Sequence, residues 1–290
     1  MGLHLSTGKR KRRLLRIFYA NPLDYVGVGI GESDDGIHWR ALPPVQVSLE
    51  PHYKGKLEIE AGAIACHNGI YYLMTGSYYK GMALCTSNSP LGPFSLMKKN
   101  WYLLPRTFTQ DGESGQLHAY FPRFFSDGNN LFVNFHVLLR EKDKNSMDRT
   151  YMAPLKKVLF DEEGILRLHW WEGNDILLGE ISSELEDAWM SDVSYRCGDE
   201  VLFHLEGEKT FLLRLDRNGK FLLWDAEGIE LKVDRSMSLA ETCSLRVLVR
   251  GSISEMYVDG EYLCSYTAKG QILSVFTDGH DAVQRKLLLP

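Results

Sequence analysis

Glu60 is the residue of this sequence whose type and neighbours are best suited to acid catalysis. It stands between Ile59 and the small residues Ala61, Gly62 and Ala63. Apolar neighbours withhold water from a carboxyl group and raise its pKa, so such a group can stay protonated near neutral pH and donate a proton. A solvated or ion-paired strand carboxylate is the alternative that these residues leave open.

Glu58 is the nearest second carboxylate in the sequence. In a strand, side chains two positions apart share one face, about 6.6 Å apart along the chain. Two carboxylates on one strand do not easily stand on opposite sides of a bond. We therefore expect Glu58 to be either a neighbour of the site or a surface charge.

The elements around these residues are short strands. Runs rich in aromatic and β-branched residues, such as Ile70-Tyr-Tyr-Leu-Met74 and Asn130-Leu-Phe-Val-Asn-Phe-His136, alternate with turn clusters such as Asn68-Gly69 and Asp127-Gly128-Asn129. Almost no stretch repeats apolar residues with the helical period over three turns. The sequence predicts an all-β protein.

A degenerate repeat organises the first part of the chain. Residues 60–73 and 120–133 both predict a strand, a tight turn and a second strand, and a third strand follows each, over 82–94 and 150–156. An earlier copy of that third strand covers 26–39. Repeats of this length, each forming a small antiparallel sheet, are typical of β-propeller blades.

The pattern changes near Glu180, where alternating strands continue without the blade turns. Regular short strands with a period of two favour a β-sandwich. We place the boundary near Gly179, which predicts a propeller domain over 1–179 and a β-sandwich over 180–290.

Four segments carry a resemblance to a known family. Three of them resemble the five-bladed propeller glycosidases of glycoside hydrolase families 32 and 43: Ser33-Asp-Asp-Gly-Ile-His-Trp39, Glu60-Ala-Gly-Ala63 followed by Gly69-Ile-Tyr-Tyr-Leu73, and Ser87-Asn-Ser-Pro-Leu-Gly-Pro-Phe94. Residues 245–261 are similar to the C-terminal β-sandwich of the family 32 invertases and fructanases. Together they favour family 32.

The resemblance implies an O-glycosyl hydrolase that acts on β-fructosides or related furanosides. In these families a Glu that opens the third blade is the general acid, and Glu60 matches that position. Glycoside hydrolysis needs one protonated carboxyl group and a second, ionised one across the bond. The expected substrate is a carbohydrate, and no cofactor or metal is implied.

The start of the next repeat supplies the other candidate substrate-binding residues: His118, Tyr120 and Arg123. The Arg123 guanidinium could bind sugar hydroxyls or hold a carboxylate ionised, and the structural alternative is pairing with an acid such as Asp111 or Glu113. Asp111 is also the best local substitute for a missing catalytic carboxylate.

The sequence departs from the family at its start. The Trp-x-Asn-Asp-Pro-type segment that carries the nucleophile is absent, as is the Arg-Asp-Pro segment, and Asn21-Pro-Leu-Asp24 is the nearest substitute. About three repeats precede the sandwich, so the propeller is N-terminally incomplete. Three explanations stay open. The start of the sequence is truncated, a homo-oligomer completes the propeller, or the chain is a catalytically inactive carbohydrate-binding or assembly module.

Composition and charge limit the classes of function that remain. A net charge of −5 disfavours a general nucleic-acid binder, which needs a clustered basic surface. No run approaches the roughly 18 apolar residues of a membrane helix. Five widely spaced cysteines without a CxxC pair predict free thiols and no metal site, which favours a cytoplasmic location.

Overall fold

The computed structural model describes residues 2–5, 13–18, 27–48, 63–77, 81–97, 102–105, 119–139, 149–182, 187–226, 228, 230–277 and 282–288. Within these ranges the chain forms 25 strands and one short 3-10 helix, η1 (Glu172–Leu177). The predicted all-β class is confirmed. The chain divides into two compact units, an N-terminal one of residues 1–103 with 121–124 and a C-terminal one of residues 104–120 with 125–290.

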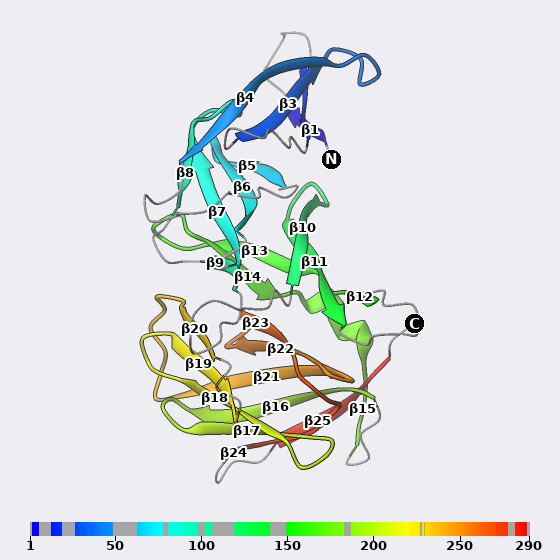
Figure 1. The fold of residues 1–290 in the computed structure, drawn as a ribbon, viewed down its shortest axis with the longest axis vertical. Helices are drawn as coiled ribbons and strands as arrows, with labels where there is room; N and C mark the ends of the chain where they lie inside the picture. The colour runs from blue at the N-terminus through cyan, green and yellow to red at the C-terminus, as the bar shows by residue number, and fades with distance from the viewer. Residues whose placement is uncertain are drawn as a thin grey trace. The chain divides into compact units, whose positions relative to one another are not determined.

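The N-terminal unit contains two antiparallel four-stranded meanders, drawn in blue and cyan in Figure 1. The first consists of β1 (Gly2–Leu5), β2 (Arg13–Phe18), β3 (Gly27–Ser33) and β4 (Arg40–Ser48). The second consists of β5 (Ile64–His67), β6 (Ile70–Ser77), β7 (Gly81–Ser87) and β8 (Phe94–Leu96), and β9 (Tyr102–Pro105) pairs with β7. The meanders join where β4 and β8 pair in parallel.

A small apolar core connects the two meanders. Its buried members are Ile30, Val45, Val47, Leu73, Cys85 and Phe94. They come from both meanders and from alternate positions of β4, as a strand with one buried face requires.

The turn between β3 and β4 is built from its own polar groups. The Asp35 carboxylate accepts hydrogen bonds from the backbone N–H groups of Ile37 and His38, both at 2.8 Å. The Trp39 indole N–H donates to the carbonyl oxygen of Gly36 at 3.0 Å. Hydrogen bonds from the His38 side chain and backbone hold the pKa of Asp35 well below its usual value.

The hairpin between β5 and β6 uses the predicted Asn68-Gly69 turn. The φ angles are 49° at Asn68 and 80° at Gly69. A two-residue type I′ turn needs positive φ at both positions, and Asn-Gly is the pair that best tolerates them.

A third meander begins the larger sheet of the C-terminal unit. It consists of β10 (Ala119–Ser126), β11 (Leu131–Leu139), β13 (Lys156–Phe160) and β14 (Leu166–Trp170), and β12 (Arg149–Met152) also pairs with β11. The predicted strand over 150–156 is thus interrupted. Proline has no backbone N–H for a ladder hydrogen bond, and Pro154 lies in the gap between β12 and β13.

The remaining strands form two sheets, and a single hydrophobic core joins them. One sheet has the order β20 (Glu230–Asp234), β19 (Lys220–Asp225), β18 (Thr210–Leu215), β17 (Glu200–Leu205) and β24 (Ile272–Thr277). The other continues the larger sheet through β23 (Glu261–Thr267), β22 (Ile253–Val258), β21 (Thr242–Arg250), β16 (Ala188–Arg196), β25 (Ala282–Leu287) and β15 (Leu178–Ile181). This is the two-sheet arrangement expected of a β-sandwich.

The expected domain boundary near Gly179 stays a prediction. Strands β11, β12, β13 and β14 of the third meander belong to the same compact unit as the two sheets, whereas Phe121–Phe124 of β10 are assigned to the N-terminal unit. The last strand of this meander pairs with β23 at His169 and Glu261. Hydrogen bonding therefore continues across the position where the sequence pattern changes.

Strand β22 is buried at every position, because both of its faces are covered. Met256 and Val258 belong to the core between the two sheets. On the other face, Tyr257 packs edge-on against Trp170 of β14, with 5.6 Å between ring centroids. The third meander therefore covers the outer face of this sheet.

A buried ion pair lies at the centre of that contact. The Lys156 ammonium of β13 lies 2.6 Å from Glu255 Oε2 of β22, and the two side chains are 0% and 3% exposed. The ammonium also donates to the carbonyl oxygen of Pro154 at 3.0 Å, and the Tyr257 hydroxyl donates to Glu255 Oε2 at 2.8 Å. Burial lowers the pKa of Lys156, and the Glu255 charge opposes that shift.

Aromatic rings complete the surroundings of Lys156. Its Nζ lies 4.2 Å from the centroid of Phe135 and 5.6 Å from that of Tyr262. A cation over a ring face gains about 2 kcal/mol when both groups are desolvated. The Tyr257 centroid lies 5.9 Å away. The Lys156 ammonium group is therefore surrounded by one carboxylate and three aromatic rings in a site that water does not reach.

Removing one partner of this pair should destabilise the protein strongly. Lys156→Met leaves the Glu255 charge buried without a cation, so we expect the free energy of unfolding in urea to fall by about 3–5 kcal/mol. The double variant Lys156→Met/Glu255→Leu should recover most of that loss, because no buried charge remains.

The control is an ion pair at the surface. Arg196 and Glu241 are 3.0 Å apart with side chains 60% and 67% exposed. Arg196→Met should change the free energy of unfolding by less than about 1 kcal/mol. A Lys156→Met protein as stable as the Arg196→Met protein would contradict a central role for the buried pair.

Candidate functional site

Four of the predicted site residues lie outside the described residues: Glu60, Glu58, Asp111 and His118. The first two precede β5 in sequence, and the other two precede β10. Their roles stay predictions.

Two predicted site residues lie on strand β10. Tyr120 is its second residue, and Arg123 is half-buried near its middle. The Arg123 Nη1 group donates a hydrogen bond to the carbonyl oxygen of Pro122 at 3.1 Å. The structure thus places both residues at the start of the third meander, as the repeat predicts.

A second charged cluster of the C-terminal unit surrounds Arg167 of β14. Its Nη2 lies 3.0 Å from Asp161 Oδ2, and its Nη1 lies 3.1 Å from Glu261 Oε1. It also donates to the backbone carbonyl oxygens of Arg235 and Ser236. One guanidinium therefore ties together the β13–β14 turn, the start of β23 and the segment after β20.

Burial shifts the pKa of two groups in this cluster. Burial raises the pKa of Glu261, against the lowering effect of Arg167 and Arg235. Burial, with a smaller contribution from the Arg167 charge, lowers the pKa of His169. Perturbed groups of this kind mark functional sites or structural ion networks. The Arg167 contacts to two backbone carbonyl oxygens favour the structural role here.

The five cysteines are free thiols. Cys197 Sγ and Cys243 Sγ lie 3.8 Å apart, and burial raises the pKa of both thiols. No group of three or more His, Cys, Asp or Glu side chains in the described ranges is arranged to hold a metal ion. Nor does the described part of the chain contain a helix long and apolar enough to cross a membrane.

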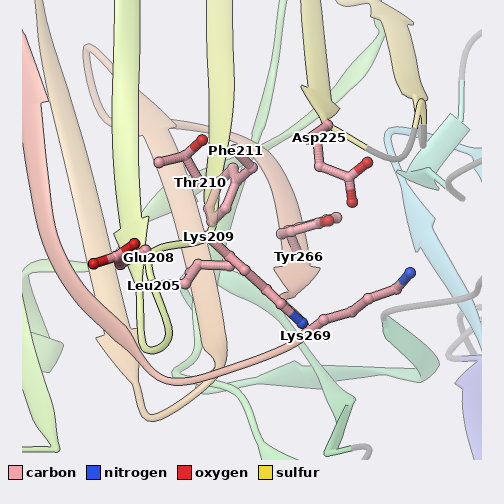
Figure 2. Close-up of a pocket in the computed structure, with 9 residues that line it drawn as sticks. Leu205, Glu208, Lys209, Thr210, Phe211, Asp225, Tyr266 and Lys269 are labelled. Carbon is pink, nitrogen blue, oxygen red and sulfur yellow. The ribbon is translucent and has the colours of Figure 1, made fainter.

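A pocket of about 290 Å³ lies at one end of the two sheets (Figure 2). Its apolar wall consists of Leu205 from the end of β17, Phe211 from β18 and Tyr266 from β23. Phe211 stacks on Phe203 with ring centroids 4.1 Å apart and contacts the Tyr266 ring at 4.8 Å. These side chains belong to the hydrophobic core between the two sheets, so the packing of that core fixes the apolar wall.

Ala226 and several polar residues complete the lining of the pocket. Glu208 and Lys209 come from the β17–β18 turn, Thr210 begins β18, Asp225 ends β19 and Lys269 follows β23. Figure 2 shows Asp225, Tyr266 and Lys269 around the same opening. The Asp225 carboxylate and the Lys269 ammonium group therefore lie near the Tyr266 ring, whereas the Glu208 carboxylate points the other way.

The sequence analysis did not identify this pocket, although one signal for it exists. In β19 the inward positions are Phe221 and Leu223, which are buried, and then Asp225. A carboxylate at the third position of an apolar period-two row marks either the end of a core or a polar site. The other lining residues come from separate loops and carry no such pattern.

No protein-family model and no curated protein sequence matches the chain. Solved structures match it in fold. The sucrose-6-phosphate hydrolase from Lactobacillus gasseri has a TM-score of 0.50 and 12% identity, over 97% of this chain and 77% of that one. The GH32 β-fructofuranosidase BmSUC1 from Bombyx mori has a TM-score of 0.50 and 13% identity, over 99% and 78%.

A fructosyltransferase from A. japonicus also matches, with a TM-score of 0.50 and 10% identity over 97% of this chain and 65% of that one. At these identities the similarity concerns the fold. The chain is all-β and shares the fold of part of the propeller glycosidases, as the sequence resemblance predicts.

The half-buried His169 should make stability depend on pH. Its folded-state pKa lies below the ordinary 6.5, so the unfolded chain binds the proton more readily. Stability should therefore decrease as the pH falls through 6.5, and His169→Gln should remove this part of the decrease. Urea unfolding of the wild-type and His169→Gln proteins at about pH 7.5 and about pH 5.5 measures the loss of stability in each. Equal losses in the two proteins would contradict the shift.

Proposed function

We propose that the chain is a glycoside hydrolase-like protein that acts on β-fructosides or related furanosides. The observation that supports this most is the fold shared with the sucrose-6-phosphate hydrolase and the GH32 β-fructofuranosidase. The names of both enzymes indicate fructoside substrates. The turn segments 33–39 and 87–94 and the 245–261 segment, which resemble family 32, support the same assignment.

Glu60 is the proposed general acid. Its neighbours Ile59, Ala61 and Ala63 favour a protonated carboxyl group, and the small side chains leave room for a sugar. In the reaction, the carboxyl proton passes to the glycosidic oxygen as the bond to the anomeric carbon breaks, and water supplies the group that replaces the leaving alcohol. This chemistry needs a second, ionised carboxylate on the other side of the bond.

The other predicted residues have supporting roles in this proposal. Asp111 is the candidate for the second carboxylate, and Glu58 is a neighbour of the site. His118, Tyr120 and Arg123 bind sugar hydroxyls at the start of the third meander. The free thiols support a cytoplasmic location, because a reducing compartment keeps cysteines unpaired.

A catalytically silent carbohydrate-binding module is the second candidate function. The absence of the Asn-Asp-Pro-type and Arg-Asp-Pro segments favours it, because the nucleophile of the family belongs to the first of these. The two candidates differ in hydrolysis but not in sugar binding, so activity measurements separate them.

Glu60→Gln tests the acid role. We expect the rate of sucrose hydrolysis to fall about 10²–10⁴-fold, because the amide cannot protonate the leaving oxygen. An aryl furanoside with a nitrophenolate leaving group needs less protonation, so its hydrolysis should fall much less. The comparison of the two substrates separates a lost acid from a damaged fold.

Glu200→Gln serves as the matched control, because Glu200 is an exposed carboxylate at the start of β17. It should leave both rates unchanged. Sucrose hydrolysis at the wild-type rate in the Glu60→Gln protein would overturn the role of Glu60. A wild-type protein that binds sugars but hydrolyses none would favour the silent module.

Association of identical chains is part of the proposal, since further copies would supply the blades that three meanders lack. Sedimentation equilibrium should then give a mass that is a multiple of the 33.1 kDa of one chain. A mass of one chain at all concentrations would exclude completion of the propeller by self-association.

A further inference from the structure

Two of the free thiols lie in contact within the C-terminal unit. Cys197 Sγ and Cys243 Sγ are 3.8 Å apart, although 46 positions separate the two residues in the sequence. Cys197 follows the end of β16, and Cys243 is the second residue of β21. The pairing of these two strands therefore brings the sulfur atoms together.

The ladder between β16 and β21 sets the positions of both cysteines. Tyr195 and Cys243 are directly opposite each other in its antiparallel register. Two positions further along, the backbone N–H of Cys197 donates to the carbonyl oxygen of Glu241 at 2.9 Å. The two cysteines are thus diagonal neighbours on one face of the strand pair.

A tyrosine fixes the turn that follows Cys197. The Tyr195 hydroxyl donates to the carbonyl oxygen of Asp199 at 2.7 Å and accepts from the backbone N–H of Leu215 at 2.9 Å. Tyr195 is fully buried, so water does not compete for these hydrogen bonds. The backbone on both sides of Cys197 is therefore held in place.

The distance between the two sulfur atoms suits a covalent bond. A disulfide bond is about 2.05 Å long, so the sulfur atoms must approach by about 1.8 Å to form one. A change of side-chain rotamer moves a sulfur atom further than that. Oxidation of the pair therefore needs no new arrangement of the strands.

The two thiols differ in exposure. Cys197 is half-buried, whereas Cys243 is 6% exposed and belongs to the core between the two sheets. A dissolved oxidant therefore meets Cys197 first. Cys243 reacts through its contact with the Cys197 sulfur atom.

The surroundings of the pair also decide which thiol ionises first. Burial raises the pKa of Cys197, while a hydrogen bond from the Cys243 thiol lowers it. Among the nearby charges, Arg217 lowers the same pKa, and Asp259 and Asp216 raise it. Burial raises the pKa of Cys243 too, and there the neighbouring Cys197 adds to the increase. Cys197 is therefore the first to form the thiolate that exchange with a disulfide requires.

We propose that Cys197 and Cys243 are a site of reversible oxidation, at which a small disulfide oxidant converts the two thiols to a disulfide bond. The proposal goes beyond the proposed function and does not require the chain to be a hydrolase.

The reaction proceeds in two exchange steps. The Cys197 thiolate attacks one sulfur atom of the oxidant, whose S–S bond breaks, and one thiolate of the oxidant leaves. Cys243 then loses its proton to solvent and attacks the Cys197 sulfur atom of this mixed disulfide, and the second thiolate of the oxidant leaves. The protein gives up two electrons and two protons, and the oxidant is reduced to two thiols.

The bond would join the two segments that pass between the sheets. Cys197 lies between β16 of the larger sheet and β17 of the five-stranded sheet, and β21 follows β20 in the opposite direction. The closed loop contains β17, β18, β19 and β20, which are four of the five strands of the smaller sheet. A bond across such a loop restricts the unfolded chain, so the oxidised protein should resist unfolding better than the reduced one.

Oxidised glutathione is the probe for this site. Cys66 is an exposed thiol on β5 that would form an adduct of its own, so Cys66→Ser in the full chain is the parent protein of every measurement. After incubation at about pH 8, alkylation in denaturant should label two thiols fewer than before. Peptide mapping by mass spectrometry should find Cys197 linked to Cys243, and dithiothreitol should restore both labels.

Two variants separate the roles of the thiols. In Cys197→Ser the link should be lost and Cys243 should stay reduced, because the oxidant does not reach it. In Cys243→Ala the reaction should stop at the glutathione adduct of Cys197. Cys197 is half-buried, so its variant keeps the test valid if Cys243→Ala does not fold.

Urea unfolding measures the consequence of the bond. The midpoint should lie at a higher urea concentration for the oxidised parent protein than for the reduced one. Cys197→Ser treated in the same way should show no difference.

Three results would overturn the proposal: an adduct that persists on Cys197 of the parent protein while Cys243 stays reduced, a link from either residue to another cysteine, or a product that dithiothreitol does not reverse. Equal urea midpoints of the oxidised and reduced parent proteins would overturn the stabilising effect. The proposed function is tested separately, because Glu60→Gln should leave the link intact and Cys197→Ser should leave sucrose hydrolysis unchanged.

Discussion

The buried pair of Lys156 and Glu255 is the interaction on which the C-terminal unit depends. It joins β13 of the third meander to β22, a strand whose other face belongs to the core between the two sheets. Two desolvated charges are tolerated only while each has the other, and the rings of Phe135 and Tyr262 exclude water from the pair. The third meander therefore packs on this sheet in one register, since a shift would separate the charges.

Arg167 provides a second polar connection between the third meander and the sheet that contains β22 and β23. Its contacts with Asp161 and Glu261 and with two backbone carbonyl oxygens fix the start of β23 against β14, where the sheets join through a single residue pair. Strand pairing is minimal at that point, so side chains supply the connection. The same strand, β23, carries Tyr266 of the pocket wall.

The meanders rely on a different kind of interaction, which is local in sequence. Asp35 and Asp127 each accept hydrogen bonds from backbone N–H groups two and three residues later, and each closes a turn between neighbouring strands. Such a turn needs no distant partner, so it can recur along the chain. This explains why the repeat is visible in a sequence whose identity to proteins of the same fold is only 10–13%.

The all-β class, the Asn68-Gly69 and Asp127 turns and the repeated meanders follow from the sequence alone, because alternation and turn chemistry act between near neighbours. The sequence also singled out Glu60, Tyr120 and Arg123, of which the last two lie on the predicted strand. The contact between Lys156 and Glu255, and the pocket that Asp225, Tyr266 and Lys269 line, become visible only in the three-dimensional fold. These groups are brought together by the packing of strands far apart in the chain, and no local pattern encodes that distance.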